Sequence, residues 1–167
     1  YRGAFSAWAR KSREKDEELP IVFDAPDYLM HAGDNFPKTA KVSLTAFASQ
    51  IKVFESKEDF FLDDEDEFPS TTSFISGGIS KFSTEEKEKP EAYAVFTGTV
   101  QSAKLIENPE TLMNFYWISV ESLNIDIDVV ADKRMLKSIP KKGNIVRVSA
   151  WIVGDFIEHD EEDCELC

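Results

Sequence analysis

The C-terminal segment "HDEEDCELC" is the one place in the sequence where a histidine and two thiols come together. His159, Cys164 and Cys167 are residue types that bind Zn²⁺, and together they could supply three ligands. A structural zinc site needs four, and no second Cys or His cluster supplies the last. The Cys-x-x-Cys also does not open a helix after a strand, as a thioredoxin-like redox motif does. The pattern therefore indicates at most a weak metal site and favours a charged tail, with no cofactor expected.

Two carboxylates, Asp126 and Asp128, lie two residues apart in a predicted strand, so they point to the same face. A hard cation needs several converging oxygens, and no EF-hand glycine or supporting histidine accompanies this pair. The sequence also contains no G-x-S-x-G, no phosphate-binding Gly loop and no H-E-x-x-H. We therefore predict that the protein is not an enzyme, and a carboxylate-based metal-dependent enzyme stays as an alternative.

Aromatic side chains gather on the predicted strands of the second half. Phe115, Tyr116 and Trp117 are consecutive, so at least one of them points outward, and Arg147 shares a face with Trp151. Aromatic rings stack on bases while cations follow the nucleic-acid backbone. These five residues are the candidate ligand-binding set for a single-stranded nucleic acid or an oligosaccharide. The carboxylates of the neighbouring predicted strand oppose phosphate, which makes nucleic acid the less favoured ligand.

The formal net charge of −13 is concentrated in two segments. Residues 55–68 hold eight acids and one lysine, residues 158–167 hold six acids and no base, and the rest of the chain is balanced. Acidic runs next to aromatic residues can steer and then anchor a basic protein partner. The candidate steering residues are Asp63, Asp64, Glu65, Asp66 and Glu67. Nucleic acid is disfavoured by the overall charge, because its binding depends on Lys and Arg.

The cysteine count and the hydropathy of the sequence bear on the cellular compartment of the protein. Two Cys at one end do not form a disulfide framework, and no run approaches the roughly 18 apolar residues of a membrane span. We expect a cytoplasmic protein, while an upstream segment before Tyr1 would leave an envelope or secreted location as the alternative.

The first half of the chain gives mixed local signals. Residues 1–18 place Phe5, Trp8 and Ala9 at helical spacing, which predicts a short amphipathic helix. Residues 21–23 predict a short strand, and the Pro- and Gly-rich stretch after them predicts a loop. Further on, Gly77-Gly78 lies between apolar residues and predicts a minimal hairpin. "TEEKEKPE" then reads as a polar linker.

Two long strands, Val42–Glu55 and Tyr93–Glu107, each change the parity of their apolar residues midway. Such a change predicts a β-bulge, a device found at the bends of small barrels. Aligned at an offset of 52, the two strands share three identities and the residues just after them a fourth, Glu58 with Glu110, which leaves both an internal duplication and chance open.

After Pro90 the strand signals are clean. Residues 113–122, 124–131 and 145–158 alternate apolar and polar residues, and residues 131–140 predict a helical turn with Met135, Leu136 and Ile139 inward. A long bulged strand with a mid-strand Gly98, two alternating strands, a short helix and "KKGNIVRVSAWIVGDF" resemble the OB-fold over about residues 93–157. The resemblance implies a Greek-key barrel that binds oligonucleotides, sugars or proteins on strands two and three. A fifth strand is needed, and Val42–Glu55 could serve.

The sequence as a whole predicts a mainly β protein with an OB-like barrel. We expect a helix-containing extension over residues 1–90, the barrel over residues 91–157 and an acidic tail over residues 158–167, or one compact domain containing all three. The expected function is non-catalytic binding of a protein or peptide, with no cofactor.

Overall fold

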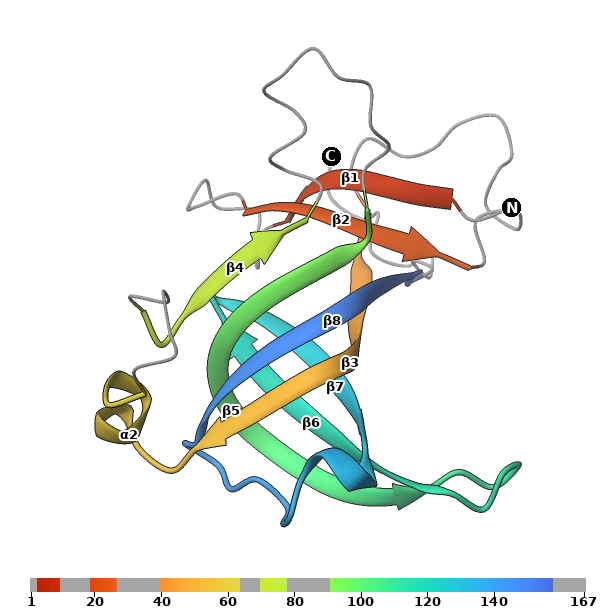
Figure 1. Cartoon of the computed structure of the whole chain (residues 1–167). Helices are drawn as coiled ribbons and strands as arrows, with labels where there is room; N and C mark the ends of the chain where they lie inside the picture. Colours follow the sequence, from red (N-terminus) through yellow and green to blue (C-terminus); the bar gives the residue numbers. More distant parts are fainter. Residues whose placement is uncertain (1–2, 10–18, 27–39, 64–69, 78–90, 158–167) are drawn as a thin grey trace, which may run out of the picture.

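The computed structural model describes residues 3–9, 19–26, 40–63, 70–77 and 91–157. The predicted mainly β fold is confirmed (Figure 1). The strands are β1 (Gly3–Ala9), β2 (Leu19–Ala25), β3 (Val42–Phe54), β4 (Ser73–Ser76), β5 (Tyr93–Glu107), β6 (Asn114–Ser122), β7 (Ile125–Asp132) and β8 (Ile145–Phe156). One short helix, α2 (Lys57–Phe61), follows β3, and a 3₁₀-helical turn, η2 (Lys133–Met135), follows β7.

Five of the strands close into a barrel. β5, β6 and β7 pair antiparallel in chain order, and β8 pairs antiparallel with both β5 and β3. The last gap is closed by β3, which runs parallel to β7. The expectation that Val42–Glu55 could supply the fifth strand is therefore confirmed, and the barrel draws on both halves of the chain.

The core follows from the two-residue period of the strands. Apolar side chains at alternate positions point into the barrel, and their partners on the opposite parity face outward. Fully enclosed interior residues include Phe96, Ile118, Val129, Val148 and Ile152. Because all five strands contribute, the interior is one continuous hydrophobic cluster.

Both predicted bulges are present. The register of β3 shifts between Ala48 and Gln50, and that of β5 shifts between Val100 and Ser102. Each extra residue moves the inward-facing set to the other parity and bends the strand around the barrel. Gly98, just before the second bulge, lies so close to β6 that an added Cβ would stand 2.6 Å from the carbonyl oxygen of Glu121.

The helix predicted for the first residues is wrong over residues 3–9. This stretch is β1, which pairs antiparallel with β2 along its full length, from Gly3↔Ala25 to Ala9↔Leu19. A helix this short is marginal alone, whereas a neighbouring apolar strand satisfies every second backbone group of the stretch. Residues 10–18 of the predicted helix lie outside the described residues.

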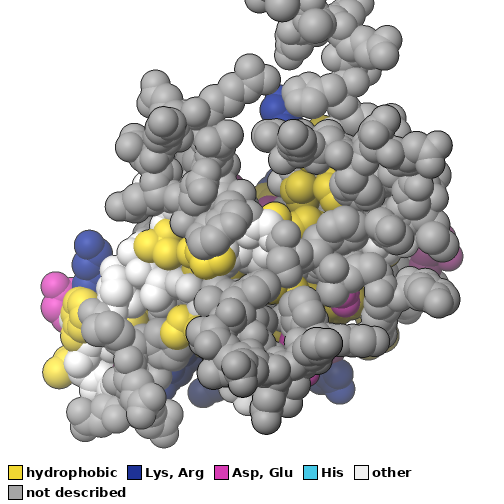
Figure 2. Space-filling model, turned by 90° about the horizontal axis from the view of Figure 1, so that it is seen from above, with side chains coloured by type: hydrophobic (Ala, Val, Ile, Leu, Met, Phe, Trp, Pro, Cys, Tyr) yellow, Lys and Arg dark blue, Asp and Glu magenta, His cyan; other side chains and the backbone are white. Residues whose placement is uncertain are grey.

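The β1–β2 hairpin lies across one end of the barrel (Figure 1). β2 joins β8 in parallel at Asp24↔Val153, and Phe23, only 3% exposed, packs edge-on against Phe156. Gly154 makes room for it, since a Cβ there would stand 2.3 Å from the Phe23 ring. Viewed from this end, the hydrophobic side chains of the described residues show in separate patches (Figure 2).

The strand before Gly77 is β4, which pairs antiparallel with β5, from Ser73↔Thr97 to Ser76↔Ala94. The predicted second arm, residues 79–82, lies outside the described residues. The prediction for the β7–β8 connection needs correction: Met135 and Ile139 are exposed and, of the three predicted inward residues, only Leu136 packs on the core, because the helical turn ends at Met135 and Leu136 is extended.

Candidate binding surface

An unbroken row of outward side chains winds around the barrel. Trp117 of β6 is paired with Val130 of β7, Val130 with Phe47 of β3, Phe47 with Trp151 of β8, and Trp151 with Tyr93 of β5. Residues directly opposite on paired strands point to the same face. We call these five residues, four aromatic ones and Val130, the aromatic band.

Strand alternation places the band outside the barrel. The residues that flank each band position on its own strand point inward, as Ala150 and Ile152 do on either side of Trp151. Three consecutive members are the most open: Phe47 is 43% exposed, Trp151 37% and Tyr93 39%. Neighbouring strands are about 4.8 Å apart, so these three side chains span about 10 Å of surface. We call Phe47, Trp151 and Tyr93 the aromatic platform.

Hydrogen bonds hold two of the three platform side chains, Trp151 and Tyr93, and the third, Phe47, packs against Trp151. The Trp151 indole Nε1 donates to Asp24 Oδ2 at 2.8 Å, and the rings of Phe47 and Trp151 lie 5.6 Å apart at an angle of 32°. The Tyr93 hydroxyl shares a 3.2 Å hydrogen bond with Ser49 Oγ, and Ser49 Oγ donates to the Ser149 carbonyl at 3.0 Å. The platform is therefore ordered before any ligand arrives, which lowers the entropy cost of binding.

The stagger of the barrel separates the platform from the rest of the band. Trp117 is paired with Lys104 of β5, whose Nζ lies 5.6 Å from the centre of the indole. The paired residues can be followed once around the barrel, from Lys104 of β5 through the aromatic band to Tyr93. Tyr93 lies on the same strand as Lys104 but eleven residues earlier, and one of these eleven positions is the bulge residue Gln101. The resulting stagger of ten carries Trp117 onto a different side of the barrel from Tyr93.

Carboxylates flank the platform. Asp24 contacts Trp151, Glu91 lies two residues before Tyr93, and Asp128 is paired with Thr45, two residues before Phe47. We call Asp24, Glu91 and Asp128 the acidic rim. Within the described residues no group of three or more His, Cys, Asp or Glu side chains is arranged to hold a metal ion. The chemistry of this surface is that of stacking and charge.

The structure divides the predicted aromatic set. Phe115 and Trp117 face outward on β6, whereas Tyr116 is 4% exposed and points into the barrel. Trp117 and Trp151 belong to the same band, with Val130 and Phe47 between them. Sequence reasoning missed Phe47 and Tyr93. Strand parity marks both as outward-facing, but only the pairing of β3 and β5 with β8 reveals that they adjoin Trp151.

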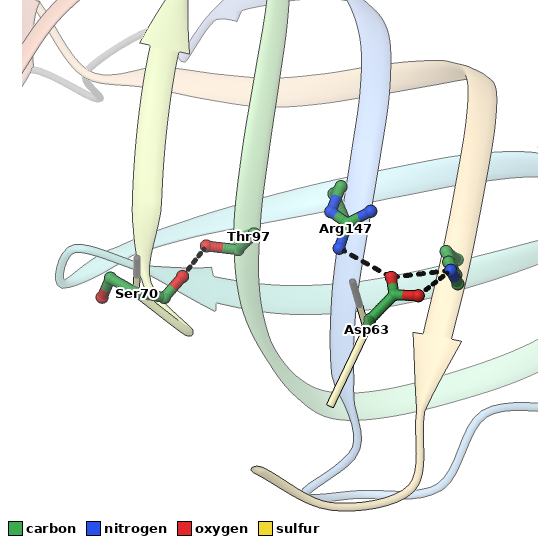
Figure 3. A network of polar contacts seen from close by, with 5 residues as sticks. Asp63, Ser70, Thr97 and Arg147 are labelled. Carbon is green, nitrogen blue, oxygen red and sulfur yellow. Dashed lines mark hydrogen bonds and ion pairs between the residues drawn. The ribbon is translucent and has the colours of Figure 1, made fainter. Parts of the chain in front are cut away.

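Arg147, the predicted cation of this set, lies elsewhere (Figure 3). Its guanidinium is 5.2 Å from the ring centre of Phe54 and 5.8 Å from that of Phe60, and its Nη2 is 3.3 Å from Asp63 Oδ2. Lys52 Nζ also donates to both Asp63 oxygens at 2.6 Å. Phe54 and Phe60 pack edge-on and form a small cluster with Ile145. Arg147 thus fastens α2 to the outer face of β3 and β8.

Asp63, the first of the predicted steering residues, belongs to this ion-paired group, with 15% of its side chain exposed. Just beyond this group, Thr97 Oγ1 donates to the Ser70 carbonyl at 3.0 Å (Figure 3). The other steering residues and the three candidate metal ligands of the tail, listed next, lie outside the described residues: Asp64, Glu65, Asp66, Glu67, His159, Cys164 and Cys167.

Comparison with known proteins adds no relative, because no family model, no curated protein and no solved structure matches the chain significantly. Of the helices in the described ranges, none has the length and apolarity needed to cross a bilayer.

Proposed function

We propose that this protein is a non-catalytic binding module that holds a basic, apolar segment of another protein on its aromatic platform. The observation that supports this most directly is that Phe47, Trp151 and Tyr93 are adjacent and face outward. Hydrogen bonds hold Trp151 and Tyr93, and Phe47 packs against Trp151. Trp, Tyr and Phe are enriched in the buried centres of protein interfaces, where rigid rings give large contact area at low entropy cost.

The charges around the platform indicate the sign of the partner's charge. The acidic rim attracts Lys and Arg, and aromatic faces add a cation–π attraction for the same groups. The nearest cations along β3 and β8, Lys52 and Arg147, are both bound to Asp63. A peptide with cations and aliphatic side chains fits this surface, whereas a phosphate backbone meets carboxylates.

The barrel itself supports an OB-like assignment. The barrel has five strands, of which only β3 and β7 pair in parallel, and a stagger of ten. These features agree with an OB barrel in which the strand that usually comes last precedes the other four barrel strands in the sequence. In that assignment β6 and β7 are strands two and three, the usual ligand face. The platform lies over β3, β8 and β5, so we place the partner on the other side of the barrel.

Selection from a random peptide library displayed on phage tests the proposal. Immobilised protein should enrich sequences that combine Lys or Arg with aliphatic residues. Trp151→Ala should weaken the affinity for the selected peptides by about tenfold or more, which is the loss expected for an interface hot spot. Trp117→Ala is the matched control, because it removes the same side chain from the far part of the band. Enrichment of acidic peptides, or equal binding by both variants, would contradict the proposal.

Single-stranded nucleic acid or an oligosaccharide on β6 is the second candidate. Phe115 and Trp117 face outward there, and Lys104 stands over the indole of Trp117. Titration with fluorescent single-stranded DNA at low and at physiological salt separates the candidates. Tight binding at physiological salt that is lost in Trp117→Ala would favour this face over the platform.

A further inference from the structure

The barrel end away from the β1–β2 hairpin has a character of its own. The hairpin meets β8 at Val153, whereas the β7–β8 connection enters β8 at Ile145, at the opposite end of the strand. This connection and the β5–β6 loop, residues 108–113, lie at the lower end of the barrel in Figure 1. We call them together the docking end.

The docking end is basic in a protein whose formal net charge is −13. Residues 108–113 and 132–144 together hold five cations and two acids, Glu110 and Asp132. Arg134 is engaged with Asp132, its Nη2 2.7 Å from Asp132 Oδ2. The remaining four are exposed and form no ion pair with a described residue: Lys133, Lys137, Lys141 and Lys142. With five cations and two acids, the docking end therefore carries a formal net charge of +3.

Aliphatic side chains project from the same end. Leu112 is 70% exposed, Met113 59%, Ile139 46% and Met135 38%. η2 contacts β6, which follows Met113 directly, so the loop and the connection are neighbours. Large aliphatic side chains exposed together at projecting turns mark contact with another apolar phase or partner.

The β5–β6 loop displays its tip rigidly. The Asn108 side chain accepts from the backbone N–H groups of Glu110 and Thr111, at 2.9 and 3.2 Å. The Asn108 carbonyl accepts from the N–H of Leu112 at 2.8 Å. Leu112 has a φ of 55°, a left-handed conformation that disfavours leucine. A strained and exposed leucine gives the isolated protein no stability, so its position fits a role in binding.

We propose that the docking end binds an anionic lipid surface. The aliphatic residues Leu112, Met113, Met135 and Ile139 enter the headgroup–acyl boundary while the lysines contact anionic headgroups, the pairing of forces used by peripheral membrane segments. Nucleic acid would share the cations but calls for stacking rings, and the side chains that project here are aliphatic. The platform lies on the barrel wall, so lipid and peptide can be bound together.

Vesicle flotation of the full chain tests this. The protein should float with phosphatidylcholine vesicles that contain about a third of phosphatidylglycerol and not with pure phosphatidylcholine, and added salt should reverse the binding. The double variant L112S/M113S and the triple variant K137E/K141E/K142E should each lower the bound fraction about tenfold. Leu62→Ser is the matched control, since Leu62 is 77% exposed but follows the acidic helix α2.

Other results would overturn the proposal. Equal flotation with both vesicle types, or unchanged flotation of both variants, would show that the docking end is not responsible. If single-stranded DNA binds the full chain and anionic vesicles do not, the cations serve a nucleic acid and the lipid proposal fails. Near-ultraviolet circular dichroism of each variant confirms that a loss of binding is not a loss of fold. If both variants unfold, single changes Leu112→Ser and Lys142→Glu carry the same test.

Discussion

Gly98 shows how closely the barrel strands approach one another. A Cβ at this position would stand 2.5 Å from Val120 Cγ1 and 2.6 Å from the Glu121 carbonyl oxygen, so β5 and β6 must separate to admit it. Gly98→Ala should lower the free energy of unfolding by about 1–3 kcal/mol, the usual cost of overpacking. Urea denaturation measures the change. Ser102→Ala, at an exposed position of the same strand, is the control and should change stability little.

The ion pair of Asp132 with Arg134 leads to a prediction about the pKa of the Asp132 carboxyl. Hydrogen bonds from the Arg134 side chain, and then from its backbone N–H, lower the pKa of the Asp132 carboxyl from 3.8 to about 2. The ionised form is favoured in the fold, so its contribution is present above the unfolded pKa and is lost as pH falls through about 2. In an NMR titration the Asp132 carboxyl carbon should show a midpoint near 2, and Arg134→Gln should move it up towards 3.8. A midpoint near 3.8 in the unaltered protein would contradict this pairing.

At the scale of elements, α2 depends on charge as well as on packing. Asp63 receives both Lys52 and Arg147, and Arg147 also lies against Phe54 and Phe60. A double-mutant cycle with Asp63→Asn and Arg147→Met should give a coupling free energy of about 1 kcal/mol or more, because both side chains are largely shielded from water. Coupling close to zero in thermal or urea denaturation would show that aromatic packing alone holds the helix.

The β1–β2 hairpin is a structural part of the barrel end. Phe23 is buried against Phe156 and over Gly154, so Phe23→Ala leaves a cavity and should cost about 3–5 kcal/mol. Phe61→Ala removes the same side chain from a position that is 61% exposed and should cost less than about 0.5 kcal/mol. Equal effects of the two changes on urea denaturation would mean that the packing of the hairpin on the barrel end does not contribute to stability.

The change of parity of the apolar residues predicted both bulges from the sequence. In the structure, the two bulges also occur at corresponding positions of β3 and β5. The register shifts after Ala48 in β3 and after Val100 in β5, positions separated by the same offset of 52 that aligns the sequence identities. The two strands therefore match in the position of their bend as well as in residues such as Lys52 and Lys104. Duplication stays a hypothesis, since two long strands of one barrel need bends for the same geometric reason.

For the whole molecule, closure requires β3. Without it β7 and β8 would present open edges, and unpaired strand edges promote aggregation. A chain cut to residues 91–157 should lack cooperative unfolding and aggregate, whereas the full chain unfolds in one transition. Thermal unfolding followed by circular dichroism checks this. A cooperative transition of the short chain would show that four strands suffice.

The sequence by itself determined the strands and the faces they bury. Alternation of apolar and polar residues set the inward parity of β6, β7 and β8, and the parity changes located both bulges, because a strand buries every second side chain whatever its partner. Local signals failed for β1 and for Met135, where pairing and the crossing of the barrel end decided the outcome.

Only the tertiary structure decided which outward residues meet. Phe47, Tyr93 and Trp151 come from three distant segments, and Arg147, four residues before Trp151, faces Asp63 instead of joining them. Strand order and barrel stagger fix these neighbours, and both depend on the simultaneous pairing of β3 with β7 and β8. That pairing joins residues more than 80 positions apart, and no pattern within a single strand records it.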